Sequence, residues 1–219
     1  MVNAELDMFD RLKYIGGYLE NKKDSFALTL PLFMCDYIKE HGYVGGGSIY
    51  SMYNDGEYKD IDIFINSEKF ANRLREYVMN RAKEVIVSKD ITKGKLVTDE
   101  SFAITKNSIS IGEIQIVVED IGEIEDVVSR FDFKHNMFWV DKGVVKTLSH
   151  TKYLDSKKLY FNDLRPRDIA GTIVRIGKYT RRGFTVSPVE VAKMLLKLNS
   201  IGIQEDELDM LKRYERFDS

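Results

Sequence analysis

The stretch that decides the fold lies between residues 43 and 65. It begins Tyr43-Val44-Gly45-Gly46-Gly47-Ser48 and ends Lys59-Asp60-Ile61-Asp62-Ile63-Phe64-Ile65. The first part predicts a short strand that runs into a glycine turn and then a short helix over residues 49–53. The last part alternates polar and apolar residues with a period of two, which predicts a second strand.

This stretch also carries the residue types of a phosphate and metal site. A turn made of Gly46, Gly47 and Ser48 at the start of a helix offers open backbone N–H groups and a hydroxyl to phosphate oxygens. On a strand, Asp60 and Asp62 point to the same side, where two carboxylates repel unless a divalent cation binds them. The pattern therefore favours metal-assisted phosphoryl or nucleotidyl transfer. The alternative is a glycine-rich turn and an exposed strand with two solvated acids.

The same order of motifs resembles a known superfamily. Gly-Gly-Ser, a short helix and then Asp-hydrophobic-Asp on a strand is the signature of nucleotidyltransferases of the DNA polymerase beta superfamily. Arg130-Phe131-Asp132-Phe133-Lys134-His135-Asn136 resembles the Arg-Arg-Asp-Phe-Thr-Ile-Asn segment of tRNA nucleotidyltransferases and bacterial poly(A) polymerases. Residues 173–184 resemble their neck helix and its Gly-Phe end. The resemblance covers about residues 45–190, and some phage-encoded nucleotidyltransferases are similar in size and pattern.

The resemblance implies a nucleotidyltransferase-type mixed sheet with flanking helices, followed by a small helical neck. It implies Mg²⁺ on Asp60 and Asp62, a nucleoside triphosphate held by the glycine turn and Arg130, and an RNA 3′ end as the preferred acceptor. Three departures weaken base selection and tRNA binding. One arginine of the Arg-Arg-Asp pair is replaced, and the large RNA-gripping domains are not expected. The Glu-Asp-x-x-Arg base-reading motif has only a loose counterpart in Asn162-Asp163-Leu164-Arg165-Pro166. A protein or small-molecule hydroxyl, or a catalytically degenerate nucleotide- or RNA-binding module, remain as alternatives.

The third carboxylate of such a site has several candidates. On the expected strand around residues 113–117, the best register places Gln115 where the resemblance implies an acid. Glu113 lies on the same face one pair earlier, and Asp132 lies in the segment that resembles the Arg-Arg-Asp motif. Because a glutamine neither takes up a proton nor contributes charge to a metal, a site built on Gln115 would be slow or would only bind nucleotide.

The clearest cationic group follows Leu164. Arg175, Lys178 and Arg182 share one face of the predicted neck helix at spacings of three and four residues. We expect Arg175 and Lys178 to contact a triphosphate or an RNA backbone. The alternative is a solvated helix face.

The remaining pattern predicts two domains, a mixed α/β (α+β) catalytic domain over residues 1–150 and a helical neck module over residues 151–219. Helices are expected over residues 5–21, 26–41, 67–83 and 121–130, and later over 169–182, 187–198 and 204–214. Strands or hairpins are expected over residues 84–88, 101–105, 108–118 and 138–145.

Composition excludes several classes of protein. The chain has 219 residues, of which 43% are hydrophobic, and this excludes intrinsic disorder. Its formal net charge of -2 excludes a histone-like protein that neutralises the phosphates of a nucleic acid. One cysteine, Cys35, excludes a disulfide framework. No signal peptide or membrane span is expected, so we predict a cytoplasmic protein without a membrane partner.

Overall fold

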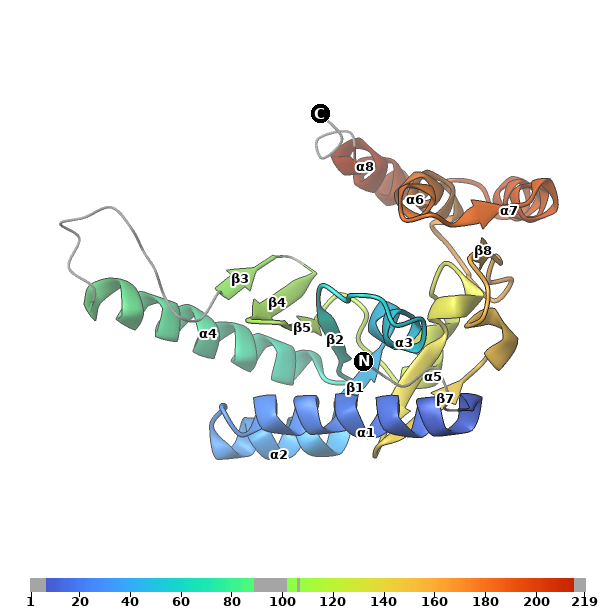
Figure 1. Cartoon of the computed structure of the whole chain (residues 1–219). Helices are drawn as coiled ribbons and strands as arrows, with labels where there is room; N and C mark the ends of the chain where they lie inside the picture. Colours follow the sequence, from blue (N-terminus) through green and yellow to red (C-terminus); the bar gives the residue numbers. More distant parts are fainter. Residues whose placement is uncertain (1–6, 89–101, 106, 215–219) are drawn as a thin grey trace. The chain divides into compact units, whose positions relative to one another are not determined.

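The computed structural model describes residues 7–88, 102–105 and 107–214 (Figure 1). The chain forms two compact units. The first comprises residues 1–127 and 138–146, and the second comprises residues 128–137 and 147–219. The predicted domains, a catalytic domain over residues 1–150 and a neck module over residues 151–219, stay a prediction.

The first unit is built on a seven-stranded mixed sheet with the order β3-β4-β5-β2-β1-β6-β7. β2 pairs with β5 in parallel, and β1–β2, β1–β6, β3–β4 and β4–β5 are antiparallel. The strands are β1 (Tyr43–Gly45), β2 (Ile61–Phe64), β3 (Phe102–Ile104), β4 (Ser108–Ile111), β5 (Ile114–Val117), β6 (Phe138–Asp141) and β7 (Val144–Thr147). This mixed α/β fold confirms the predicted fold class.

The alternation of β2 separates the two faces of this sheet. Ile61 and Ile63 are fully buried, whereas Asp62 between them is half-buried. Helices pack on the sheet and against each other, with α1 and α2 side by side (Figure 1). The helices of this part are α1 (Met8–Ala27), α2 (Leu32–His41), α3 (Gly47–Tyr53), α4 (Glu68–Ser88) and α5 (Ile124–Ser129). The apolar face therefore forms the core, and the carboxylate of Asp62 lies on the other face.

One predicted strand is wrong. Residues 84–88 are the last part of α4, which begins at Glu68 and ends at Ser88. A short apolar run does not by itself distinguish a strand from a helix. No glycine or proline interrupts α4 before this run. Once a helix has formed, each further residue loses backbone freedom but gains one hydrogen bond, so the helix extends through the run. The strand predicted over 101–105 is found as β3, and residue 101 lies outside the described residues.

The second unit is mainly helical. It contains α6 (Ile169–Arg181), α7 (Pro188–Ile201) and α8 (Glu205–Tyr214), with a short parallel pair of β8 (Lys158–Leu159) and β9 (Thr185–Val186). Short 3-10 turns form over Lys134–Asn136 and Thr151–Tyr153. The predicted cap of α7 is confirmed, because the Ser187 side chain accepts a hydrogen bond from the Glu190 backbone N–H. Helices therefore make up most of this unit after residue 168.

An aromatic cluster in the second unit buries a histidine. The His135 ring is 2% exposed and lies 6.0 Å from the Phe133 ring, 5.4 Å from Tyr179 and 4.9 Å from Phe184, centroid to centroid. Burial lowers the pKa of His135 from 6.5 to about 3, although the Asp132 carboxylate acts in the opposite direction. The imidazole is therefore neutral at pH 7 in the folded protein.

This buried histidine makes stability depend on pH. Between pH 6.5 and about 3, His135 is protonated in the unfolded chain but not in the folded chain. The free energy of unfolding therefore falls as the pH is lowered through this range. The expected loss is at most about 1.4 kcal/mol per pH unit. We expect urea unfolding of His135→Phe at pH 7 and pH 5 to show a smaller loss than the wild-type protein. The control His41→Phe, at an exposed site, should keep the wild-type loss; equal losses in all three proteins would contradict the prediction.

Candidate active site

The glycine turn forms as predicted and lies against a carboxylate. β1 ends at Gly45, Gly46 adopts a left-handed φ of 83°, and α3 begins at Gly47. The Gly46 N–H donates to the Phe138 carbonyl over 3.2 Å. A Cβ on Gly46 would lie 3.6 Å from Asp62 Oδ2. The fold thus brings the turn and the carboxylate of Asp62 together.

Ser48, in the first turn of α3, has a buried hydroxyl. The residue is 3% exposed, and its Oγ has no hydrogen-bond partner in the described part of the chain. A buried hydroxyl left unsatisfied costs about 1–3 kcal/mol. By contrast, a Cβ built on the neighbouring Gly47 meets no atom within 4 Å. The turn therefore combines an open backbone with a polar group that a ligand oxygen would satisfy.

Asp60 lies just before β2, and Asp62 lies within it. Asp62 pairs in register with Gly45 on β1 and with Gln115 on β5. Asp60 directly precedes the strand; its side chain is 33% exposed and lies 3.7 Å from Lys59 Nζ. By the period of two, both carboxylates share the face opposite the buried Ile61. The donor set, two carboxylates beside an open glycine turn, fits a divalent cation that also contacts phosphate.

Glu113 has a partner of its own. Its carboxylate accepts a hydrogen bond from Lys22 Nζ on α1 over 2.5 Å, and this bond raises the pKa of Lys22. Its backbone carbonyl accepts the Ile61 N–H over 2.8 Å at the start of β2. The structure therefore joins Glu113 to α1 and to the beginning of the strand that carries Asp62.

Asp132 and Arg175 meet in the second unit, within a cluster that also contains Asp168 and Arg165; we call these four residues the Asp132 cluster. Arg175 Nε donates to Asp132 Oδ2 over 2.6 Å, and its Nη2 donates to Asp132 Oδ1 and to Asp168 Oδ2, both over 2.7 Å. Arg165 Nη2 lies 2.8 Å from Asp168 Oδ2. Burial acts to raise the pKa of Asp132, but Arg175 and Arg165 hold it below its usual value. Two acids and two arginines thus compensate each other.

The backbone beside the Asp132 cluster fits it closely. Asp168 has a left-handed φ of 55° and precedes α6. Its carboxylate lies so close to the next turn that a Cβ on Gly171 would be 2.2 Å from Oδ1. The sequence analysis missed Asp168, which lies just before the helix predicted over residues 169–182 and seven residues before Arg175.

The other predicted nucleotide-binding residues also belong to the second unit. Arg130 is half-buried, and its backbone carbonyl accepts a hydrogen bond from Arg165 Nη1. Lys178 is exposed on α6. The predicted site residues therefore form two sets: Gly46, Gly47, Ser48, Asp60, Asp62 and Glu113 in the first unit, and Arg130, Asp132, Arg175 and Lys178 in the second.

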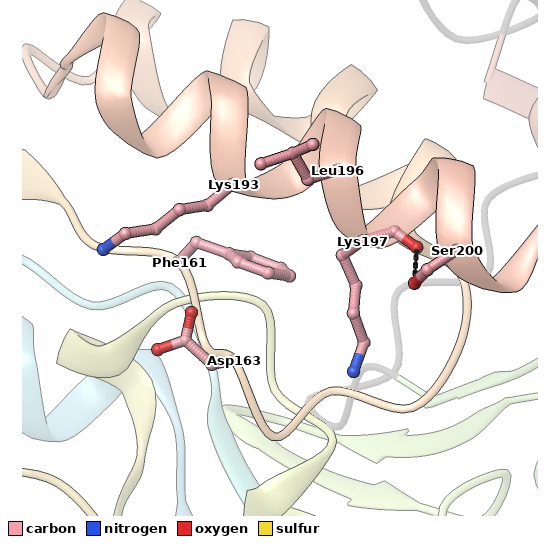
Figure 2. Close-up of a pocket in the computed structure, with 6 residues that line it drawn as sticks. All are labelled: Phe161, Asp163, Lys193, Leu196, Lys197 and Ser200. Atoms are coloured by element: carbon pink, nitrogen blue, oxygen red, sulfur yellow. Dashed lines mark hydrogen bonds between the residues drawn. The ribbon is translucent and has the colours of Figure 1, made fainter.

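The second unit also has a hollow of about 330 Å³ in front of α7 (Figure 2). It is lined by Phe161, Asp163, Lys193, Leu196, Lys197 and Ser200. Lys193 is paired with Glu190 over 2.7 Å, and the Ser200 hydroxyl donates to the Lys197 carbonyl. None of the predicted site residues lines this hollow, so we assign it no part in the chemistry.

Within residues 7–88, 102–105 and 107–214, no three side chains of the His, Cys, Asp and Glu types gather as a metal-binding group. Within the same ranges, no helix is both long enough and apolar enough to cross a membrane.

A family model matches residues 17–158, which include the glycine turn, Asp60, Asp62 and Glu113. This model describes the Gabija anti-defense 2 family protein. The chain belongs to the Gabija anti-defense 2 family. The search of curated proteins found no significant match.

Among solved structures, the chain resembles a CCA-adding enzyme in complex with CTP, with a TM-score of 0.55 and 15% sequence identity over 89% of this chain and 47% of that chain. It also matches the Thermotoga maritima CCA-adding enzyme complexed with tRNA, with a TM-score of 0.46 and 15% identity over 90% of this chain and 44% of that chain. The chain spans about half the length of these structures. At such identity, the first likeness shows that this member of the family has a nucleotidyltransferase fold.

Proposed function

We propose that the chain is a metal-dependent nucleotidyltransferase, which moves a nucleoside monophosphate from a nucleoside triphosphate to a hydroxyl, preferably at an RNA 3′ end. The observation that carries the proposal is the meeting of the glycine turn with Asp62, whose Oδ2 lies 3.6 Å from the Cβ position of Gly46. The partnerless Ser48 hydroxyl and the fold shared with a CCA-adding enzyme support it.

In this proposal Asp60 and Asp62 hold Mg²⁺, while Ser48 and the N–H groups of the turn hold the triphosphate. Bound there, Mg²⁺ would neutralise charge on the phosphate oxygens. The acceptor oxygen forms a bond to the α-phosphorus, the bond from that phosphorus to the bridging oxygen breaks, and pyrophosphate leaves with the electron pair. The hydroxyl proton passes to a carboxylate or to water.

The third carboxylate stays open between Glu113 and Asp132. Each is ion-paired, Glu113 with Lys22 and Asp132 with Arg175, so each would need to share its carboxylate with a cationic partner. Contacts of Arg130, Arg175 and Lys178 with the nucleotide likewise remain proposals. In the Asp132 cluster, Arg175 is held by two acids, which would orient its guanidinium for any such contact.

A second candidate changes only the acceptor. The name of the family includes Gabija anti-defense, and this favours a protein or small-molecule hydroxyl of that defence as the target. The chain covers 47% of the CCA-adding enzyme that it resembles, so that likeness does not favour RNA over another acceptor. A degenerate module that binds nucleotide without transfer is the third candidate.

Transfer of labelled nucleotide tests these candidates. The purified chain with Mg²⁺ is incubated with each of four α-labelled nucleoside triphosphates and with tRNA, bulk RNA or bulk protein. We expect label on RNA that depends on Mg²⁺; label on protein alone would favour the second candidate. Nucleotide binding without transfer to any acceptor would favour the binding module. If the chain shows no nucleotide binding and no transfer, the proposed function is contradicted.

The glycine turn is tested by adding bulk where the protein itself has room. Because a Cβ on Gly47 meets no protein atom within 4 Å, Gly47→Val should leave the fold intact and block the approach of a phosphate. We expect the affinity for triphosphate to fall at least about tenfold, which corresponds to about 1.4 kcal/mol. Gly17→Val is a matched control, since its Cβ also meets nothing within 4 Å but it lies on α1. Equal affinity in both variants would remove the turn from the site.

A further inference from the structure

The row of side chains beside Asp62 continues across the sheet with uncharged polar groups. Asp62 is in register with Gln115 on β5, and Gln115 is in register with Ser110 on β4. Residues in register point to the same face of a sheet, and neighbouring strands lie about 4.8 Å apart. Gln115 is therefore the side chain next to Asp62 on β5, while the neighbour on β1 is Gly45, which has no side chain.

Hydrogen bonds fix the amide of Gln115. Its Nε2 donates to Ser108 Oγ over 3.2 Å and to Ser110 Oγ over 3.3 Å. Ser108 is itself held by the Thr105 hydroxyl over 3.1 Å. Both amide hydrogens are thus used on the β4 side. Because an amide carries one nitrogen and one oxygen, and the serines take Nε2, Oε1 is the atom of this amide that can bind a cation.

A cation on Asp62 needs further oxygen ligands. Within the described ranges, no three side chains of the Asp, Glu, His and Cys types lie close enough together to hold a metal ion. Carbonyl oxygens of Asn and Gln are accepted ligands of hard divalent cations. We propose that Gln115 is the third protein ligand of the metal site, a neutral carbonyl oxygen held in place by Ser108 and Ser110. This inference rests on the proposed function, since it uses the same cation on Asp60 and Asp62.

The proposal has a consequence for charge. Two carboxylates and one amide give the site one negative charge fewer than three carboxylates, so the metal is held weakly until the triphosphate brings its own charge. The site therefore favours metal that arrives with nucleotide. Ser108 and Ser110 are positioning residues, because they act only through the amide of Gln115.

Binding of Mn²⁺ alone, followed by the electron paramagnetic resonance signal of free Mn²⁺, tests the ligand without relying on activity. Gln115→Glu keeps the size of the side chain and adds a charge, and we expect it to tighten Mn²⁺ binding by about five- to tenfold. Gln115→Leu should weaken it by at least about threefold. Gln204→Glu, the same substitution in the second unit, should leave the affinity unchanged.

Unchanged Mn²⁺ affinity in both Gln115 variants, with normal thermal unfolding, would overturn the proposal. If Asp62→Asn still abolishes Mn²⁺ binding in that case, the two-carboxylate site of the proposed function survives and only the role of Gln115 fails. If wild-type protein binds no Mn²⁺ with or without nucleotide, both proposals fail. Should Gln115→Leu unfold, Gln115→Glu and Ser110→Ala decide: the first must tighten and the second must weaken Mn²⁺ binding.

Discussion

We expect replacement of Asp62 with asparagine to lower the rate of the proposed nucleotidyl transfer by at least about a thousandfold and to leave the fold intact. The half-buried carboxylate lies on the face of β2 opposite the buried isoleucines, so it contributes little to the core. Asparagine keeps the shape but loses the charge that would hold Mg²⁺ against the phosphates. We expect the same direction for Asp60→Asn. The rate is measured with the labelled-nucleotide assay and the fold by thermal unfolding.

The matched control for this prediction is Asp36→Asn, an exposed aspartate on α2 of the same unit. It should change neither the rate nor the unfolding temperature. If transfer in Asp60→Asn or in Asp62→Asn stays within about tenfold of the wild-type rate, the two-carboxylate metal site is contradicted.

The second large effect concerns stability. Asp132→Asn is expected to lower the free energy of unfolding by about 3–5 kcal/mol, because it leaves Arg175 without one of its two partners in a buried ion network. The Asp132 side chain is 14% exposed, so solvent compensates little of the loss. Urea unfolding measures the change. The control Asp163→Asn breaks an ion pair with Lys134 at a carboxylate that is 58% exposed, and it should cost at most about 1 kcal/mol.

The same variant separates two roles for Asp132. If its carboxylate serves only the Asp132 cluster, Asp132→Asn loses stability and keeps its transfer rate at temperatures where it is folded. If it is the third carboxylate, the folded variant loses about 10²–10⁴-fold in rate. A change in unfolding free energy below about 1 kcal/mol would contradict the structural role derived from the ion pairs.

Local pattern predicted a large part of the fold. The period of two in β2, the glycine turn before α3 and the proline and serine at the start of α7 all depend on residues within a few positions of each other. Local pattern failed over residues 84–88, where the propagation of a helix outweighed the strand preference of Val85, Ile86 and Val87.

The site could be predicted only where it lies within one stretch of sequence. Asp62 on β2 and Gly46 before α3 belong to one short stretch of chain, and the pairing of β1 with β2 brings them together. The partners of Glu113 and Asp132 lie 91 and 43 residues away, on α1 and α6, and no spacing rule connects them. The sequence therefore identified both acids as candidates without showing that each one already binds a cationic side chain.

A buried lysine shows the same limit. Lys23 is 2% exposed, although it lies between the helices predicted over residues 5–21 and 26–41. In the structure its ammonium group binds Glu20 and the Gly42 carbonyl, over 2.8 Å and 3.1 Å, and so caps the end of α2. Only the packing of α1 beside α2 makes this position an interior one.

The order of strands and helices around the glycine turn, and the placement of Asp60 and Asp62 on the same side of the chain, follow from local pattern, because backbone preferences and the period of two act between near neighbours. The neighbours of those residues depend on how the whole chain packs. The parallel pairing of β2 with β5 places Gln115 beside Asp62, and the folding of residues 128–137 into the second unit places Asp132 on Arg175. Strand register and helix packing bring together residues that are far apart in the chain. The burial of apolar surface across the whole core determines which register and which packing form.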